Sequence, residues 1–163
     1  HEDLKADVIS QEHTVDQTEE EKKYREILRD DENPVLALNL DGSISFVSSQ
    51  FLDKTHYTEA DLKNKSLFLL FHQEDLPVFM AAFGEILKNQ KAVSAIGPYR
   101  VRDKNGNYEY HIGYATPIIE NGQIDKILVV TKSIEDKIKQ TEKAKVEINR
   151  LRSAAENTLI ANQ

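Results

Sequence analysis

The stretch YRVRDKNGNYEYHIGYATPIIENGQIDKILVVTK, residues 99–132, decides the fold of this chain. Two pairs, Asn105-Gly106 and Asn121-Gly122, separate apolar segments in which the residues facing each side alternate. Asn-Gly is a strong hairpin signal, because both central residues of a type I′ turn need a positive φ angle. The stretch therefore predicts a meander of three antiparallel strands. Their expected ranges are 93–102, 107–117 and 123–132.

Upstream, Asp41-Gly42 gives the same signal and predicts a hairpin of strands 35–40 and 43–48. Pro98 has no N–H to donate to a sheet ladder, so the strand that contains it is expected at an edge. A hairpin, a crossover and a meander can share one antiparallel sheet with helices on one face, which makes the expected fold class α+β.

About forty residues between the hairpin and the meander have a helical pattern. Short helices are expected at 50–54 and 59–63, the second capped by Thr58, and a long helix is expected to start at Asp75 as its N-cap. Pro77 is acceptable in the first turn of that helix. The apolar stripe of the long helix consists of Leu76, Phe79, Met80, Phe83, Ile86 and Leu87.

Two arms flank the core, which spans residues 33–133. Residues 1–32 are acidic, and 2–32 are expected to form a helix with Tyr24, Ile27 and Leu28 as its apolar side. Residues 134–163 form the other arm, with a helix expected over 134–160. Its small and apolar residues follow a heptad seam made of Thr141, Ala144, Ile148, Leu151, Ala155 and Thr158. The alternative is a solvated helix with mixed charges.

Composition excludes several classes of function. The net charge of −7 over 163 residues argues against nucleic acid or an anionic membrane as the main partner. The chain contains no cysteine, which excludes disulfides, thiolate metal sites and a thiol nucleophile. No apolar run is long enough to span a membrane, and no phosphate-binding loop, zinc-protease motif or nucleophile signature is present. We therefore expect a cytoplasmic protein without direct membrane contact that is not itself an enzyme.

Several segments, taken in order, resemble the PAS family of sensory domains over about residues 25–135. His56 to Leu62 resembles the family stretch G-Y-S-x-E-E-L, and Phe71 to Asp75 resembles the h-P-E-D entry to its long helix. The other matching segments are 33–42, 46–48, 51–52, 100–106 and 115–119. The resemblance implies a PAS fold: a five-stranded antiparallel sheet with helices on one face, here with additional N- and C-terminal helices.

Two positions depart from the family pattern. His56 stands where the family often has glycine, and Ser133-Ile134-Glu135 replaces the D-I-T that commonly ends the last strand. In the family, that aspartate can join the core to the exit helix through a salt bridge. The substitution puts this coupling in doubt, although Ser133 can still cap the helix.

The resemblance also implies a ligand pocket between the inner sheet face and the long helix. Alternation places His111, Gly113 and Ala115 on that face, and the two small residues are expected to leave room opposite the helix. The candidate ligand-binding residues are Phe79, Met80, Phe83, Tyr99, Val101, His111, Gly113 and Thr131. The alternative is that these residues simply fill a core.

The cofactor is not defined by the sequence. His72 lies where some haem-binding PAS sensors have a histidine, and it is the candidate haem ligand. Flavin is conceivable, but without cysteine the cysteinyl-flavin photochemistry of light-sensing relatives is excluded. No protein metal site is expected.

The outer sheet face, with Tyr110, Ile112 and Tyr114 on one strand, is too apolar to be left bare. The first helix, a second copy of the chain, or both are expected to cover it, and we expect a parallel homodimer. The residues expected to carry dimerisation and relay are Tyr24, Ile27, Leu28, Ile112, Tyr114, Val130, Ser133, Ile148 and Leu151.

These features favour a sensory domain of a bacterial-type signal-transduction protein. It would sense a small ligand or a partner and pass the change through its exit helix to an output domain beyond residue 163. Histidine kinase, chemoreceptor and diguanylate cyclase outputs are all compatible, as in two-component systems. The alternatives are a ligand-free PAS module that serves as a dimerising spacer, and a haem-based gas sensor.

Overall fold

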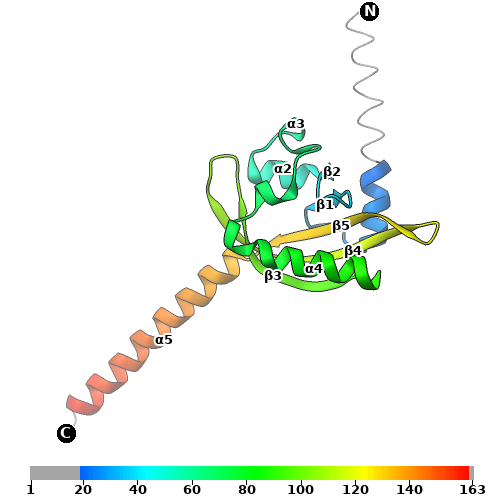
Figure 1. The fold of residues 1–163 in the computed structure, drawn as a ribbon. Coiled ribbons are helices and arrows are strands. Elements are labelled where there is room, and N and C mark those ends of the chain that lie inside the picture. The colour runs from blue at the N-terminus through cyan, green and yellow to red at the C-terminus, as the bar shows by residue number, and fades with distance from the viewer. Residues whose placement is uncertain (1–18, 162–163) are drawn as a thin grey trace, which may run out of the picture.

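A computed structural model describes residues 19–161 of the chain (Figure 1). A helix over residues 19–28 comes first. The elements that follow are β1 (Val35–Leu38), β2 (Ile44–Val47), α2 (Ser49–Thr55), α3 (Glu59–Leu62), the 3₁₀ turns η1 (Leu67–Leu70) and η2 (Gln73–Asp75), α4 (Leu76–Asn89), β3 (Val93–Arg102), β4 (Tyr108–Glu120), β5 (Gln123–Ser133) and α5 (Glu135–Ala161). Among the described residues, no helix is both long and apolar enough to cross a bilayer.

The five strands form one sheet in the order β2-β1-β5-β4-β3, and every neighbouring pair is antiparallel. After the β1–β2 hairpin, the helical segment carries the chain to the far edge of the sheet, where β3 lies. The strands β4 and β5 then fill the positions between β3 and β1. The predicted sheet is thus confirmed. Pro98 lies on the edge strand β3, as its missing N–H requires.

The three glycine turns connect the expected strands, but only one has the expected turn type. Asn121 and Gly122 both have positive φ angles, of 53° and 77°, as a type I′ turn needs. At the other two turns only the glycine, Gly42 or Gly106, has a positive φ. Hydrogen bonds from Gly42 N to Asn39 O and from Gly106 N to Asp103 O define three-residue loops instead.

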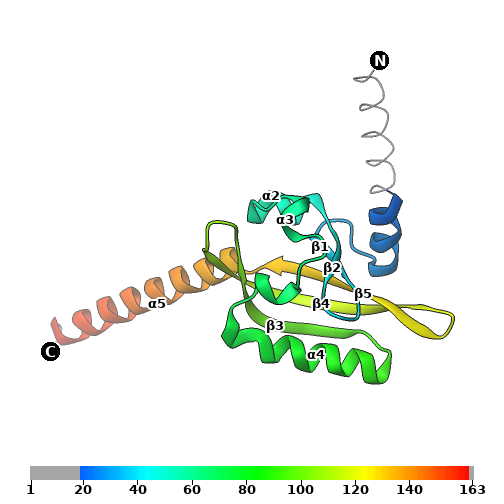
Figure 2. The same cartoon turned by 45° about the horizontal axis from the view of Figure 1, so that its top comes forward.

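The helical segment packs on one face of the sheet, with α4 lying along it (Figure 2). Thr58 begins α3 with the expected cap, in a capping box with Asp61. Fewer apolar residues of α4 face the core than its apolar stripe predicts. Ala82 is buried there, whereas Met80 is 60% exposed and Leu87 is 45% exposed.

The first helix ends earlier than expected, at residue 28 instead of 32. Arg29 has a φ of 54°, and Asp30 accepts hydrogen bonds from the N–H groups of Glu32 and Asn33, which turns the chain toward β1. Arg25 fixes this turn by donating to the carbonyls of Asp30 and Asn33, both at 3.1 Å. The part of the predicted helix over residues 2–18 lies outside the described residues.

The helix over residues 19–28 covers part of the outer sheet face of its own chain. Tyr24 is buried and packs edge-to-face on Phe46, with ring centroids 5.3 Å apart, and Leu28 packs beside it. Val35, Ala37, Ile118, Leu128 and Val130 complete this outer cluster. The other end of the sheet leads into α5, which extends away from the core (Figures 1 and 2).

Candidate functional site

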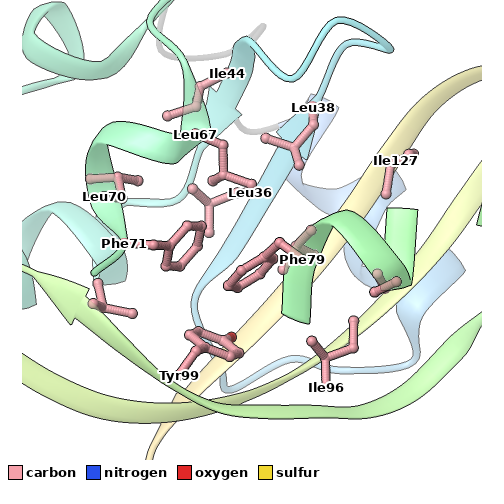
Figure 3. Packing of buried hydrophobic residues seen from close by; sticks show 14 of the residues in the cluster. Leu36, Leu38, Ile44, Leu67, Leu70, Phe71, Phe79, Ile96, Tyr99 and Ile127 are labelled. Atoms are coloured by element: carbon pink, nitrogen blue, oxygen red, sulfur yellow. The ribbon is translucent and has the colours of Figure 1, made fainter. Parts of the chain in front are cut away.

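Three aromatic rings fill the interior between the sheet and the helices (Figure 3). Phe71 stacks on Phe79 with a centroid separation of 3.9 Å. Tyr99 meets both rings at steep angles, 5.3 Å from Phe71 and 4.6 Å from Phe79. Such edge-to-face contacts are the favoured arrangement of aromatic rings, so the cluster is a well-packed core.

Tyr99 occupies the space beside Gly113 that the sequence led us to expect as ligand room. A methyl group built on Gly113 would lie 2.5 Å from Tyr99 Oη and 3.3 Å from its ring. Glycine at position 113 therefore makes room for the side chain of Tyr99 from the neighbouring strand. Both residues lie on the inner face of the sheet. Ala115, the second small residue, is fully buried in the same cluster.

The phenol of Tyr99 begins a chain of buried polar groups. Thr131 Oγ1 lies 2.7 Å from Tyr99 Oη and 2.8 Å from His111 Nδ1. All three side chains are at most 2% exposed. Burial raises the pKa of Tyr99 far above its usual range and lowers the pKa of His111 to about 4, so that both side chains are neutral at pH 7.

The chain continues from His111 to the surface. His111 Nε2 lies 3.2 Å from Glu109 Oε1, and Lys54 Nζ lies 3.1 Å from the same oxygen. Burial raises the pKa of Glu109, but hydrogen bonds from Ser133 and Lys54 outweigh it and leave this pKa below its usual value. A cavity of about 100 Å³ borders this end, lined by Lys54, Thr55, Val101, Asp103, Asn107, Tyr108, Glu109 and His111.

The start of α5 is attached to β4 beside this polar chain. Tyr110 donates its N–H to Glu135 Oε1 at 2.6 Å, and its carbonyl accepts from the N–H of Ile134 at 2.9 Å. Ser133 Oγ accepts from the N–H of Glu135 at 3.3 Å, so Ser133 pairs one free N–H at the start of α5, whereas Ile134, whose carbonyl accepts from the N–H of Ile138, occupies the N-cap position. Ser133 is also the cross-strand partner of His111, so the start of the helix lies beside the buried polar chain.

The remaining candidate ligand residues divide into two groups. Phe79 and Val101 are buried with Tyr99, and Phe83 is half-buried beside Phe79. Met80 faces solvent, which corrects its expected place opposite Gly113, since it lies one residue beyond the inward side of α4.

His72 lies away from the aromatic interior. Its Nδ1 accepts a hydrogen bond from the N–H of Glu74, and its ring lies 5.0 Å from the exposed ring of Tyr108. Phe71, Phe79 and Tyr99 fill the space that a haem would need beside the sheet. These residues do not fit the haem group. Among the described residues, no cluster of three acidic or histidine side chains could hold a metal ion.

The expected relay residues fall on three surfaces. Tyr24, Leu28 and Val130 are buried or partly buried in the outer cluster, whereas Ile27 is 43% exposed and contributes little to it. Ile112 is 40% exposed and Tyr114 is half-buried, so the first helix leaves their half of the outer face open. Ile148 and Leu151 are exposed on α5.

Sequence reasoning missed Glu109, Lys54 and Glu135. Glu109 could have been found, because the alternation that places His111 and Gly113 inward also places residue 109 on their side. Lys54 comes from α2, and no sequence signal joins it to β4.

Comparison with known proteins agrees with this architecture. The model of the PAS fold family matches residues 44–131. The chain therefore belongs to the PAS fold family, whose members are typically non-catalytic sensory or signalling modules. No curated protein sequence matches the chain.

Solved structures show the same fold at low sequence identity. The PAS-B domain of Drosophila melanogaster Cycle, with bound ethylene glycol, is 17% identical, with a TM-score of 0.57, over 61% of this chain and 98% of that domain. A point variant of that domain with bound glycerol gives the same values. A PAS domain of a Colwellia psychrerythraea protein is 18% identical, with a TM-score of 0.57, over 64% of this chain and 87% of that one.

Proposed function

We propose that this chain is the sensory relay domain of a larger signalling protein, in which two copies pair in parallel through α5. The PAS core would bias how the two helices pack and so control an output domain that follows residue 163. A coiled coil with two packing states is a suitable output element, because a small differential contact shifts its equilibrium.

The observation that carries this proposal is that α5 is long and exposed to solvent along most of its length. The helix has 27 residues, which corresponds to about 40 Å, and every described side chain from 139 to 160 is exposed. An isolated helix of mixed composition is marginal in water, so a partner is expected along its length. Ile148 and Leu151 lie on the predicted seam, both more than half exposed.

Val146 provides a matched control for the seam. It is 67% exposed on the same helix, but it lies on the side opposite the seam positions 144, 148 and 151. We expect sedimentation equilibrium to give a dimer for the whole chain, a monomer for the Ile148→Ser/Leu151→Ser variant, and a dimer for Val146→Ser. A monomeric wild-type chain at high concentration, or equal effects of the two variants, would overturn the dimer proposal.

The absence of cysteine allows a test of the parallel arrangement. Thr158 lies on the seam near the end of α5, so a Thr158→Cys variant should form a disulfide between copies under mild oxidation. In an antiparallel pair the two residues would lie near opposite ends. Val146→Cys, on the other side of the helix, should stay reduced. Failure of Thr158→Cys to cross-link in a confirmed dimer would contradict the parallel arrangement.

A small polar ligand in the interior is a second candidate function. The polar groups of Tyr99, Thr131 and His111 meet in a core that is otherwise apolar. The Cycle PAS-B structures hold glycerol and ethylene glycol, which are small polyols. Since Tyr99 fills the space beside Gly113, such a ligand would have to displace its ring.

An absorbance scan and native mass spectrometry of fresh protein test the ligand candidate directly. An added mass that disappears in a Tyr99→Trp variant, whose larger ring would fill the interior, would support an internal receptor. A Soret or flavin band would point to a cofactor. A colourless dimer without added mass would favour the spacer function over ligand sensing.

A further inference from the structure

The polar side chains of the interior form one connected path to the exit helix. Tyr99, Thr131 and His111 are joined at 2.7 and 2.8 Å, His111 faces Glu109 at 3.2 Å, and Ser133 is the residue of β5 paired with His111 across the sheet. We refer to these five residues as the polar path. Its inner end contacts the rings of Phe71 and Phe79, and at its outer end Ser133 Oγ accepts from the first N–H of α5.

The donors and acceptors along the path can be assigned from its outer end. Glu109 has Lys54 Nζ 3.1 Å away and is ionised at neutral pH, so its carboxylate only accepts. His111 must then donate from Nε2 and accept at Nδ1. Thr131 must donate its hydroxyl to Nδ1, which leaves its oxygen to accept from the phenol of Tyr99.

This assignment makes the path directional, and at its outer end Glu109 Oε1 is held by close ionic contacts with His111 and Lys54 without a well-aligned hydrogen bond. Burying an unpaired hydroxyl or imidazole is unfavourable, so each member depends on its neighbours. A displacement of Tyr99 leaves Thr131 without its donor and frees the His111 ring to take its other tautomer. That change withdraws the Nε2 proton that faces Glu109, in the residue that pairs with Ser133 across the sheet.

We propose that the polar path positions the first turn of α5, so that the packing of Tyr99 in the core sets the position of the exit helix. The inference deepens the proposed relay function and rests on it for its biological meaning. Thr131, His111 and Glu109 act as positioning residues through Ser133. The path takes the place of the aspartate that the PAS family often has at position 133.

The test compares two buried threonines. Thr131 belongs to the path, whereas Thr55 is 4% exposed and its hydroxyl donates to the carbonyl of Phe51 in its own helix. Hydrogen exchange of the whole chain would be followed at amides 134–139, relative to those of β1, which report global opening. We expect Thr131→Val to speed exchange at 134–139 about fivefold relative to β1, as the loss of one hydrogen bond would. Thr55→Val should not change this ratio.

Conservative and double variants separate positioning from simple destabilisation. Thr131→Ser keeps the hydroxyl and should restore the wild-type ratio. In a Ser133→Ala background, where the path is already cut, Thr131→Val should add little, so the two effects should be non-additive. Nitrogen chemical shifts should place the His111 proton on Nε2 in the wild type and show a mixture of tautomers in Thr131→Val.

An unchanged exchange ratio in Thr131→Val, or an equal change in Thr55→Val, would overturn the inference. A proton on His111 Nδ1 in the wild type would also overturn it. The proposed function fails separately, since a monomer in sedimentation with an intact exchange effect removes the dimeric relay and leaves the polar path in place.

Discussion

Glu135 in the first turn of α5 accepts a hydrogen bond from the main-chain N–H of Tyr110, with an N···O distance of 2.6 Å. The Tyr110 carbonyl accepts from Ile134 in turn, so a side chain extends the β4–β5 ladder by one step beyond the last strand residue. The exit helix therefore begins in contact with the sheet, and movements of β4 reach it directly.

Replacing Glu135 tests this contact. Glu135→Ala removes the acceptor and should shift the Tyr110 amide proton upfield and raise its temperature coefficient, whereas Glu135→Gln keeps an acceptor oxygen and should lie close to wild type. The local loss should be about 1 kcal/mol. An unchanged Tyr110 amide in Glu135→Ala would contradict the contact.

His111 should make the fold sensitive to mild acid. The folded chain protonates this histidine only near pH 4, whereas the unfolded chain does so near pH 6.5. The unfolded state therefore binds more protons between these values, and stability falls as pH falls through this window, by up to about 3 kcal/mol. Glu109, Lys54 and Glu135 are the charged groups whose fields act on this imidazole.

Urea unfolding at pH 7 and pH 4.5 measures this dependence. The wild type should lose stability between the two values, and His111→Gln should lose clearly less, since glutamine has no proton to take up in this range. Identical losses in the two proteins would mean that His111 is not the group responsible.

Gly113 and Gly84 form a matched pair for the filled interior. Gly113→Ala places a methyl group 2.5 Å from Tyr99 Oη and should cost about 1–3 kcal/mol of stability by overpacking. A methyl group built on Gly84, in α4, would have no neighbouring atom within 4 Å. Gly84→Ala should therefore stabilise the fold by about 1 kcal/mol through the higher helix propensity of alanine. Thermal and urea unfolding would measure both changes.

The cause of the Gly113 effect can be checked by a second substitution. Tyr99→Phe removes the clashing hydroxyl, so the Gly113→Ala/Tyr99→Phe chain should be less destabilised than the sum of the single variants predicts. Strict additivity would place the clash elsewhere.

The first helix should contribute to stability through Tyr24 and very little through Ile27. Tyr24 is 4% exposed on the outer cluster, so Tyr24→Ala should cost about 3 kcal/mol, as truncation of a buried aromatic ring does. Ile27 is 43% exposed, and Ile27→Ala should cost well under 1 kcal/mol. Equal losses in urea unfolding would mean that the helix does not pack on its own sheet as described.

The order of strands and the edge position of Pro98 could be predicted because glycine turns and a missing N–H are local signals. Turn type was predicted correctly only at Asn121-Gly122, since the loop length around Gly42 and Gly106 depends on strand register. The periodicity of α4 predicted which side of the helix faces the core, but not how many residues of that side are buried. Met80 lies outside the buried part.

The candidate site was harder to predict than the fold. Alternation correctly placed His111 in the interior, and the resemblance to the PAS family correctly placed Thr131 there. It could not reveal that Tyr99 fills the space over Gly113, because β3 has two register shifts before Tyr99 and strand alternation does not carry through them. The ion pair of Glu109 with Lys54 joins segments far apart in sequence, which local patterns do not report.

Part of each border of the sheet is occupied by other segments of the same chain. Along β2, Ile44 exchanges hydrogen bonds with Asn64 and Lys65 at 2.8 Å. Along β3, Arg100 bonds His72 and Asp75 through its main chain. At these positions a strand from another molecule would find the main-chain groups already bonded, and Pro98 has no N–H to offer. Growth of the sheet into fibrils or strand-swapped aggregates is thereby disfavoured at these positions.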